Sequence, residues 1–230
     1  MNTQIEAYES NRQLKQHEAE MIDHILDKFG DSSFTVLDIG CADGTFVEAA
    51  AQKMKKATFV GIDISQKLIE AAKSKEVKNA SFMTQDALKY ETELRFEVIV
   101  CSGIMSIFDC YSVPLTKWLN LLSDTGCIFV FGRFNSEDID VKVQFKNNYN
   151  NSSWEGGLTA YSIKTIGRFL VELGYNFRFT KFNLKSEITK SENPIRTYTL
   201  KLKDDSNLVV NGANLIAEQY FLTISKNNDI

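Results

Sequence analysis

The 230-residue sequence lacks the features that several common functions need. It has no run of lysines or arginines and its net charge is −4, so nothing in it attracts nucleic acid in general. The opening stretch MNTQIEAYESNRQ is polar and no segment approaches the length of a membrane span. We therefore expect a cytoplasmic protein without a secretory signal that binds neither nucleic acid nor membrane.

Cysteine and histidine are too sparse to suggest a metal site or a disulfide framework. The four cysteines form no C-x-x-C pair and lie mostly in apolar, strand-like contexts: Cys41, Cys101, Cys110 and Cys127. We expect reduced thiols. The two histidines, His17 and His24, both lie near the N-terminus, and we interpret each as a solvated helix residue. No His/Asp pair or carboxylate cluster occurs in the core segments, so the sequence offers no metal site and no convincing general base.

Strand-like and helical patterns alternate through residues 34–133, which accommodate five β–α units. "ASFMTQ" leads into a short helical piece, and another helix begins near Pro114. Near-continuous apolar strands separated by helices predict a parallel sheet that is covered on both faces. Before this region, a helix over residues 4–29 that ends at Gly30 forms an N-terminal helical arm, residues 1–30.

The pattern changes after residue 133. Residues 134–160 are polar, Asn-rich and without clear periodicity, and a connection of this length is expected to be a lid. A helix from Ser162 to Leu173 follows and is closed by Gly174. The remaining strand-like stretches have no helix between them, which predicts an antiparallel end to the sheet. Residues 1–230 thus read as a single α/β domain.

The seam between the first strand and the first helix of this region, "FTVLDIGCADGTFVEAA", combines an acid with two glycines: Asp38, Gly40 and Gly44. Glycines at such a seam let a ligand approach the backbone closely, beside the free N–H groups of the helix. A phosphate-binding P-loop would need a lysine after Gly44, and none follows. A dinucleotide fingerprint would need glycines where Ala42 and Thr45 stand.

The D-x-G-x-A-x-G pattern resembles the first motif of the class I S-adenosylmethionine-dependent methyltransferases, and the resemblance covers roughly residues 30–225. It implies a Rossmann-like, doubly wound sheet of seven mostly parallel strands with an antiparallel terminal strand. It also implies that Asp63 accepts hydrogen bonds from both ribose hydroxyls, that Asp86 faces the adenine amino group, and that "FEVIVCSGIMSI" lies beside the sulfonium. The expected residues around S-adenosylmethionine are Asp38, Gly40, Cys41, Ala42, Gly44, Asp63, Ile64, Asp86, Ala87 and Ser102.

Other roles stay open for some of these residues. Asp38 is equally suited to orienting the loop, and Ala42 replaces the middle glycine of the motif as a mild departure. Cys41 and Cys101 are expected to be small fillers, not nucleophiles. No Pro-Cys borders the fourth strand and no [DNS]-P-P-[YFW] ends it, so nucleobase methylation is not expected.

The substrate side is expected in three places. One is the loop from Gly103 to Asp109, and the second is Arg133, directly after the fifth strand. The third is the lid, with Tyr149, Trp154 and Tyr161, although Trp154 suits the lid's own core nearly as well. The tail around Arg196 is loosely similar to methyltransferases that modify precursors of bacterial surface polysaccharides. A guanidinium binds carboxylate or phosphate oxygens and cannot abstract a proton, so we expect an anionic acceptor.

The leading hypothesis is an O- or N-methyltransferase of a small polar metabolite, such as a sugar, nucleotide-linked or phosphoramidate precursor. A protein side-chain methyltransferase and a cofactor-binding regulatory module without activity are the alternatives. The sequence also leaves homodimerisation open.

Overall fold

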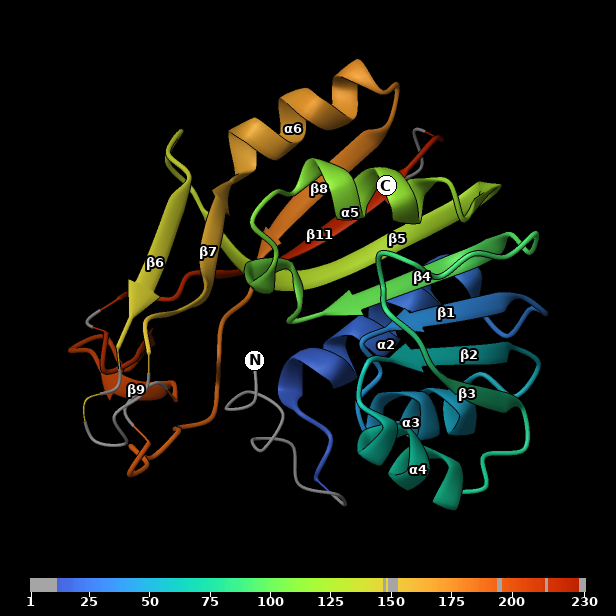
Figure 1. Cartoon of the computed structure of the whole chain (residues 1–230), viewed down its shortest axis with the longest axis horizontal. Coiled ribbons are helices and arrows are strands. Elements are labelled where there is room, and N and C mark those ends of the chain that lie inside the picture. Colours follow the sequence, from blue (N-terminus) through green and yellow to red (C-terminus); the bar gives the residue numbers. More distant parts are fainter. Residues whose placement is uncertain (1–11, 147, 149–152, 194–195, 214, 228–230) are drawn as a thin grey trace.

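The computed structural model describes residues 12–146, 148, 153–193, 196–213 and 215–227. Its centre is one twisted sheet of nine strands, of which seven follow the order β3-β2-β1-β4-β5-β11-β8 and two more, β6 and β7, are joined to it at β5 (Figure 1). Their bounds are β1 Thr35–Ile39, β2 Thr58–Asp63, β3 Ala80–Thr84, β4 Phe96–Ser102, β5 Leu122–Asn135, β6 Val141–Phe145, β7 Glu155–Ser162, β8 Asn176–Lys181 and β11 Gln219–Ser225. The pairs from β3 to β5 are parallel, whereas β11 is antiparallel to both β5 and β8. This confirms the predicted sheet, in which the last strand of the chain, β11, is antiparallel to its neighbours.

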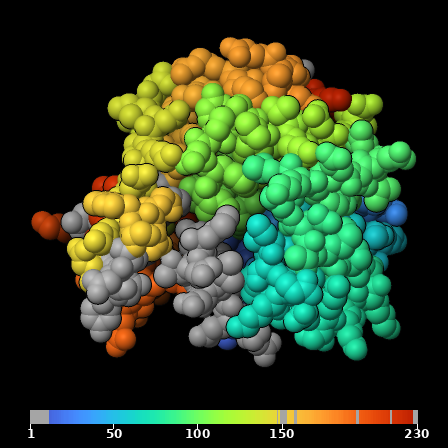
Figure 2. All heavy atoms as spheres, viewed as in Figure 1, coloured from blue at the N-terminus to red at the C-terminus, as the bar shows by residue number. Residues whose placement is uncertain are grey.

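Helices cover both faces of this sheet, as the continuous apolar strands require. α2 (Gln16–Phe29), α3 (Thr45–Lys53) and α4 (Gln66–Ser74) contribute to one buried cluster. α5 (Ser112–Leu119) and α6 (Ile163–Glu172) contribute to the other, and Figure 2 shows the atoms of these two segments in the upper part of the molecule.

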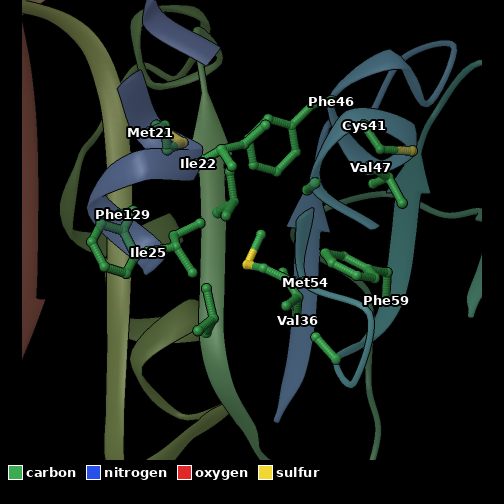
Figure 3. Close-up of a cluster of buried hydrophobic side chains, with 14 of the residues drawn as sticks. Met21, Ile22, Ile25, Val36, Cys41, Phe46, Val47, Met54, Phe59 and Phe129 are labelled. Atoms are coloured by element: carbon green, nitrogen blue, oxygen red, sulfur yellow. The ribbon is translucent and has the colours of Figure 1, made fainter. Parts of the chain in front are cut away.

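The predicted N-terminal helix, α2, forms part of the core. Met21, Ile22 and Ile25 are fully buried, and they point toward α3 and the strands, near Phe46 and Phe129 (Figure 3). The helix ends at Gly30, as predicted, where φ is +59°. Its predicted start at residue 4 is wrong for the described part of the chain, because residues 12–15 are not helical and α2 begins at Gln16.

Our interpretation of the two histidines as solvated helix residues is wrong. The His17 ring stacks on Phe131, with centroids 4.0 Å apart and 8° between the planes. The His24 ring meets Phe221 edge-on at 4.8 Å. Both rings therefore pack onto the sheet, and burial lowers the pKa of His17 to about 4.

Residues 134–160 also differ from the expected irregular segment. β6 (Val141–Phe145) and β7 (Glu155–Ser162) form an antiparallel hairpin, and the end of β7 pairs in parallel with the end of β5. β5 itself runs on to Asn135, because β11 pairs with it as far as Arg133 and β7 pairs with Phe134 and Asn135. Arg133 therefore lies inside the strand and not after it.

Of two further predicted helices, one is absent and the other is present. The helical piece after β3 is a series of turns, because Asp86 holds the N–H of Leu88 in a local turn. α6 is confirmed: the Ser162 side chain accepts hydrogen bonds from its first turn, and Gly174 at φ +78° follows its end.

The carboxyl ends of β1, β2 and β4 all point to one edge of the sheet. The β6–β7 hairpin and a separate hairpin of β9 (Tyr198–Lys201) and β10 (Asn207–Val210) lie beyond this edge (Figure 1). In the parts of the chain that are described, no helix has the length and apolar character to cross a membrane. We therefore expect the ligand site at the carboxyl edge, where the parallel strands end and the glycine loop lies.

Candidate functional site

The loop after β1 has the conformation that its glycines predict. Gly40 and Gly44 have φ values of +77° and +73°, which L-residues rarely adopt. A Cβ on Gly40 would stand 2.9 Å from Ile104 Cγ2, so this glycine also lets the loop after β4 pack against the loop after β1. The two loops meet at the carboxyl edge of the sheet.

Ala42 is more than a mild departure from the motif. It has a φ of +49°, so an alanine occupies the left-handed conformation that glycine would take at a lower energy. Its N–H donates to Asp63 Oδ2 at 3.0 Å. The acid at the end of β2 therefore holds the glycine loop of β1 in place.

Asp63 has a second local role. Its Oδ1 accepts the N–H of Ser65 at 2.9 Å, and Ser65 Oγ accepts the N–H of Leu68 at 3.4 Å as the N-cap of α4. Asp63 is half-buried, and the next residue, Ile64, leaves 55% of its surface exposed. A carboxylate and an exposed apolar side chain thus stand together where β2 ends.

The ends of β3 and β4 complete this edge. Asp86 Oδ1 accepts the N–H of Leu88 at 2.9 Å, and the Asp86 side chain is 35% exposed. Ser102 at the end of β4 is half-buried, and the N–H of Gly103 donates to the carbonyl of Phe131. Polar groups of three strands therefore follow one another along the edge: Asp63, Asp86 and Ser102.

Asp38 is the most deeply buried of the predicted site residues with a carboxyl group. Its surface is 3% exposed, and Oδ2 has no hydrogen-bond partner among the described residues. Burial, together with the negative charges of Glu18 and Asp63, raises the pKa of Asp38 to about 8, although the positive charge of Arg12 acts in the opposite direction.

An ion-pair network that the sequence did not predict joins the start of α2 to the loop after β1. Glu18 on α2 is 4% exposed and accepts two hydrogen bonds from the Arg12 guanidinium, at 2.7 and 2.6 Å. Arg12 Nε also lies 3.4 Å from Asp43, a fully buried residue of the glycine loop. The segment before α2 is thereby attached to the loop after β1.

Arg133 lies on the same side of β5 as Phe129 and Phe131, because strand side chains alternate. It is half-buried, and no acid or carbonyl oxygen of the described residues pairs with its guanidinium. Burial alone lowers the pKa of Arg133. Arg133 is thus a half-buried cation two residues beyond Phe131, and the Phe131 ring stacks on the ring of His17.

Further positive charge lies at the start of α2. Burial and the charges of Arg12 and Arg196 lower the pKa of Lys15. The predicted residue Arg196 thus lies within electrostatic range of the segment that covers the glycine loop.

The aromatic residues expected on the substrate side differ in their exposure to solvent where the structure describes them. Trp154 is 70% exposed. Tyr161 is buried and its hydroxyl donates to the carbonyl of Phe108 at 2.6 Å, and burial raises its pKa to about 12. Tyr149 lies outside the described residues.

Two of the cysteines, Cys41 and Cys101, lie at this edge of the sheet. Cys41 and Cys101 are buried, and burial raises the pKa of both thiols, which agrees with small fillers and not with nucleophiles. A search of the described residues finds no group of three or more metal-ligating side chains.

A family model described as a methyltransferase domain matches residues 30–193. Among curated proteins, the ubiquinone biosynthesis O-methyltransferase of Candida albicans is 34% identical over 109 residues, 44% of this chain and 32% of that protein. The (S)-coclaurine N-methyltransferase of Papaver somniferum is 34% identical over 100 residues, 42% of this chain and 28% of that protein. The chain therefore spans about a third of the length of these relatives.

A longer match has lower identity. The malonyl-[acyl-carrier protein] O-methyltransferase 1 of Ilyobacter polytropus is 23% identical over 185 residues, which cover 79% of this chain and 60% of that protein. Among solved structures, magnesium protoporphyrin IX methyltransferase from Synechocystis with bound S-adenosylhomocysteine has a TM-score of 0.61. That match covers 94% of this chain and 90% of the other at 12% identity, so it shows a common fold.

Proposed function

Because this chain belongs to the family of methyltransferase domains, we propose that it transfers a methyl group from S-adenosylmethionine to an oxygen or nitrogen of a small, anionic metabolite. The family match covers the strands and loops of the carboxyl edge, and a neighbour with the same fold holds S-adenosylhomocysteine. The chemistry needs no metal and no nucleophilic thiol, in agreement with the buried cysteines.

The cofactor is proposed to lie across the glycine loop. Each oxygen of Asp63 accepts one backbone N–H and keeps a lone pair, so the carboxylate can also accept the two ribose hydroxyls. The exposed side chain of Ile64 offers an apolar surface to the adenine ring, and Asp86 an acceptor to its amino group. Gly40, Cys41, Ala42, Gly44, Ala87 and Ser102 complete the proposed cofactor contacts.

The charge of the acceptor is inferred from one observation, the guanidinium of Arg133. A half-buried cation without an acidic partner in the described structure is costly, and an anionic ligand supplies the missing charge. A carboxylate or phosphate can be the group that Arg133 holds beside a methylated hydroxyl. It can equally be the methylated atom, since an oxygen that is already ionised needs no general base.

A relative supports the second possibility by its name. The Ilyobacter polytropus protein is an O-methyltransferase of a malonyl group. For this chain, sugar phosphates, nucleotide-linked sugars and phosphoramidate-type precursors of surface polysaccharides are the acceptors that we propose to test first. Trp154 and Arg196 are proposed to contact the acceptor from the two hairpins beyond the edge.

The experiment uses S-adenosylmethionine with a radioactive methyl group and a metabolite extract that is divided into neutral and anionic fractions by ion exchange. We expect label in a compound of the anionic fraction. Transfer to protein would instead support a protein side-chain methyltransferase, and binding without transfer a regulatory module.

The role of Arg133 is tested on the labelled acceptor. Arg133→Ala should lower kcat/KM for an anionic acceptor by about tenfold to a hundredfold, which corresponds to a lost charged hydrogen bond of about 1.4–2.8 kcal/mol. Arg133→Lys keeps the charge without the planar fork and should recover part of the loss. Arg178→Ala, on the exposed side of β8, is the matched control and should have no effect. Equal turnover of neutral analogues would show that this view of the acceptor is wrong.

A further inference from the structure

His17 on α2 is an imidazole that aromatic rings hold in place. Its ring stacks on Phe131 of β5, with centroids 4.0 Å apart and 8° between the planes, and it meets Phe182 edge-on at 6.1 Å. Phe131 and Phe182 also contact each other edge-on, with centroids 5.1 Å apart. The two rings therefore fix the plane of the imidazole on the face of the sheet that α2 covers.

The nitrogens of this imidazole are free to bind a ligand. In the described part of the chain, no backbone or side-chain group forms a hydrogen bond or an ion pair with His17. The residue is half-buried, and neither of its nitrogens is among the fully buried polar atoms that lack a partner. Both nitrogens therefore reach the surface, where a neutral imidazole offers one donor and one acceptor.

α2 places His17 at the carboxyl edge of the sheet. Before the first turn of α2, Arg12 Nε lies 3.4 Å from Asp43 of the glycine loop. Phe29 in the last turn contacts Phe34, just before β1. The helix therefore starts at the carboxyl edge and runs toward the opposite edge. His17 is its second residue, so the imidazole lies beside the edge that carries the glycine loop.

The groups around His17 keep its imidazole uncharged at pH 7. Burial lowers the pKa of His17 to about 4. The charge of Glu18 acts in the opposite direction, and the charges of Lys15 and Arg12 add to the effect of burial. The ring is therefore in the form that accepts a proton.

Arg133 is the nearest charged residue to this ring along β5. Side chains alternate in a strand, so Arg133 follows Phe131 on the same face, about 7 Å further toward the carboxyl edge. At the end of β8 the charged residue is Lys181, and it pairs with Glu218. An uncharged imidazole and a cation without an acidic partner in the described structure thus border the same end of β5.

We propose that His17 is the general base of methyl transfer, and that the methylated atom is a hydroxyl oxygen beside the anionic group that Arg133 holds. The inference rests on the proposed function and selects one of the two acceptors that it leaves open. Because the base and the cation border one end of β5, one acceptor can contact both. Its anionic group binds the guanidinium, and its hydroxyl donates to the imidazole.

The reaction requires a proton acceptor but not a strong one. The hydroxyl oxygen bonds to the methyl carbon, the bond from this carbon to the sulfonium sulfur breaks, and its electron pair stays on the sulfur. The hydroxyl proton passes to a nitrogen of His17 and from there to the solvent. A hydroxyl becomes strongly acidic only while its oxygen acquires the methyl group, so an imidazole of low basicity is sufficient at that moment.

Two variants of His17 test this role on the acceptor that is labelled in the metabolite extract and purified from the anionic fraction. His17→Phe keeps a ring on Phe131 without a basic nitrogen, and His17→Ala leaves space for an added imidazole. We expect both variants to lower kcat by about a hundredfold or more with little change in KM. Free imidazole in the buffer should raise the kcat of His17→Ala about tenfold and leave His17→Phe unchanged.

The pH dependence of kcat separates a base from a packing residue. The wild type should keep a constant kcat from pH 6 to pH 9, because His17 is unprotonated over this range. In His17→Phe the solvent must remove the proton, so kcat should rise with pH, by up to about tenfold per unit. His24→Ala removes the other histidine of α2, whose ring packs on Phe221, and this matched control should keep the wild-type kcat and profile. Binding of S-adenosylhomocysteine shows that each variant is folded.

The position of the methyl group is an independent readout. Fragmentation of the product in a mass spectrometer should place it on a former hydroxyl oxygen. A methyl group on a carboxylate oxygen, a phosphate oxygen or a nitrogen would contradict the role of His17, and so would a wild-type kcat in His17→Phe. A lowered kcat with a flat pH profile in His17→Phe would assign the imidazole to packing alone. In these cases the proposed function stands. If the wild type transfers no methyl group to any fraction, the proposed function itself is wrong.

Discussion

At the scale of single residues, Asp63 combines two structural hydrogen bonds with lone pairs that stay available to a ligand. Asp63 holds the N–H of Ala42, and it thereby helps to keep an alanine in the left-handed conformation that costs about 1–2 kcal/mol. The same carboxylate holds the start of α4 through Ser65. Loss of Asp63 should therefore affect both the loop and any ligand on it.

A comparison of two neighbouring residues separates these effects. Asp63→Ala should weaken S-adenosylhomocysteine binding by more than tenfold, about 1.4 kcal/mol, because ribose acceptors and the loop bond are lost together. Ser65→Ala removes the α4 N-cap and should lower the free energy of unfolding by about 1 kcal/mol without changing Kd. Calorimetry and urea unfolding measure the two quantities. Unchanged affinity in Asp63→Ala would refute the placement of the cofactor, and so would competition by NAD or ATP.

At the scale of elements, the sequence predicted those features that are determined by residues close together in the chain. Strand periodicity located β1 to β5, and Gly30 and Ser162 marked a helix end and a helix start correctly. It missed the attachment of α2 to the glycine loop, since Arg12 and Asp43 are 31 positions apart and no local pattern connects them.

Two other misses have a physical reason. His17 lies four residues before the buried Met21, so helical spacing alone could have placed its ring toward the sheet. β6 also carried a local signal, because Val141, Val143 and Phe145 alternate with exposed polar residues at the period of a strand. The pairing itself could not be predicted, because it joins Val141 to Ala160, 19 positions later in the chain.

The hairpin has an inner and an outer part that should differ in stability. Tyr161 and Ser162 at the inner end are buried and pair with β5. β6 at the outer side is half-exposed, and its contact with the body includes an exposed ion pair from Lys142 to Asp109. Such exposed pairs contribute about 0–1 kcal/mol.

Hydrogen exchange can show whether the outer part closes as a lid. Without ligand, the amides of Val141–Phe145 should exchange at least tenfold faster than those of Tyr161 and Ser162. With cofactor product and an anionic acceptor both bound, exchange over Val141–Phe145 should slow, as expected for a segment that closes over the site. Protection of β6 that is already complete in the free protein would assign the hairpin to the fixed core.

At the scale of the whole molecule, two buried groups make the stability depend on pH in opposite directions. Burial lowers the pKa of His17 to about 4, so the folded state resists its protonation and loses stability as the pH falls from 6.5 toward 4. Burial raises the pKa of Asp38 to about 8, so the folded state holds a proton that the unfolded chain releases above pH 4. The contribution of Asp38 therefore decreases as the pH rises from 4 to 8.

Above pH 6.5 the imidazole is neutral in the folded state and mostly neutral in the unfolded chain, so Asp38 contributes more than His17 to the pH dependence. We expect the free energy of unfolding of the wild type to decline over this interval, by up to about 1.4 kcal/mol per pH unit. Asp38→Asn cannot titrate, so its stability relative to the wild type should increase with pH, whatever constant difference the amide introduces. Asp124→Asn removes an exposed partner of Lys226 and should leave the slope unchanged. Urea unfolding at pH 6.5, 7.25 and 8 measures the slopes, and a constant difference between Asp38→Asn and the wild type would mean that Asp38 is ionised in the free protein. A steady decline of the wild type relative to Asp38→Asn would instead mean that the folded state holds a proton on the buried acid of the first strand.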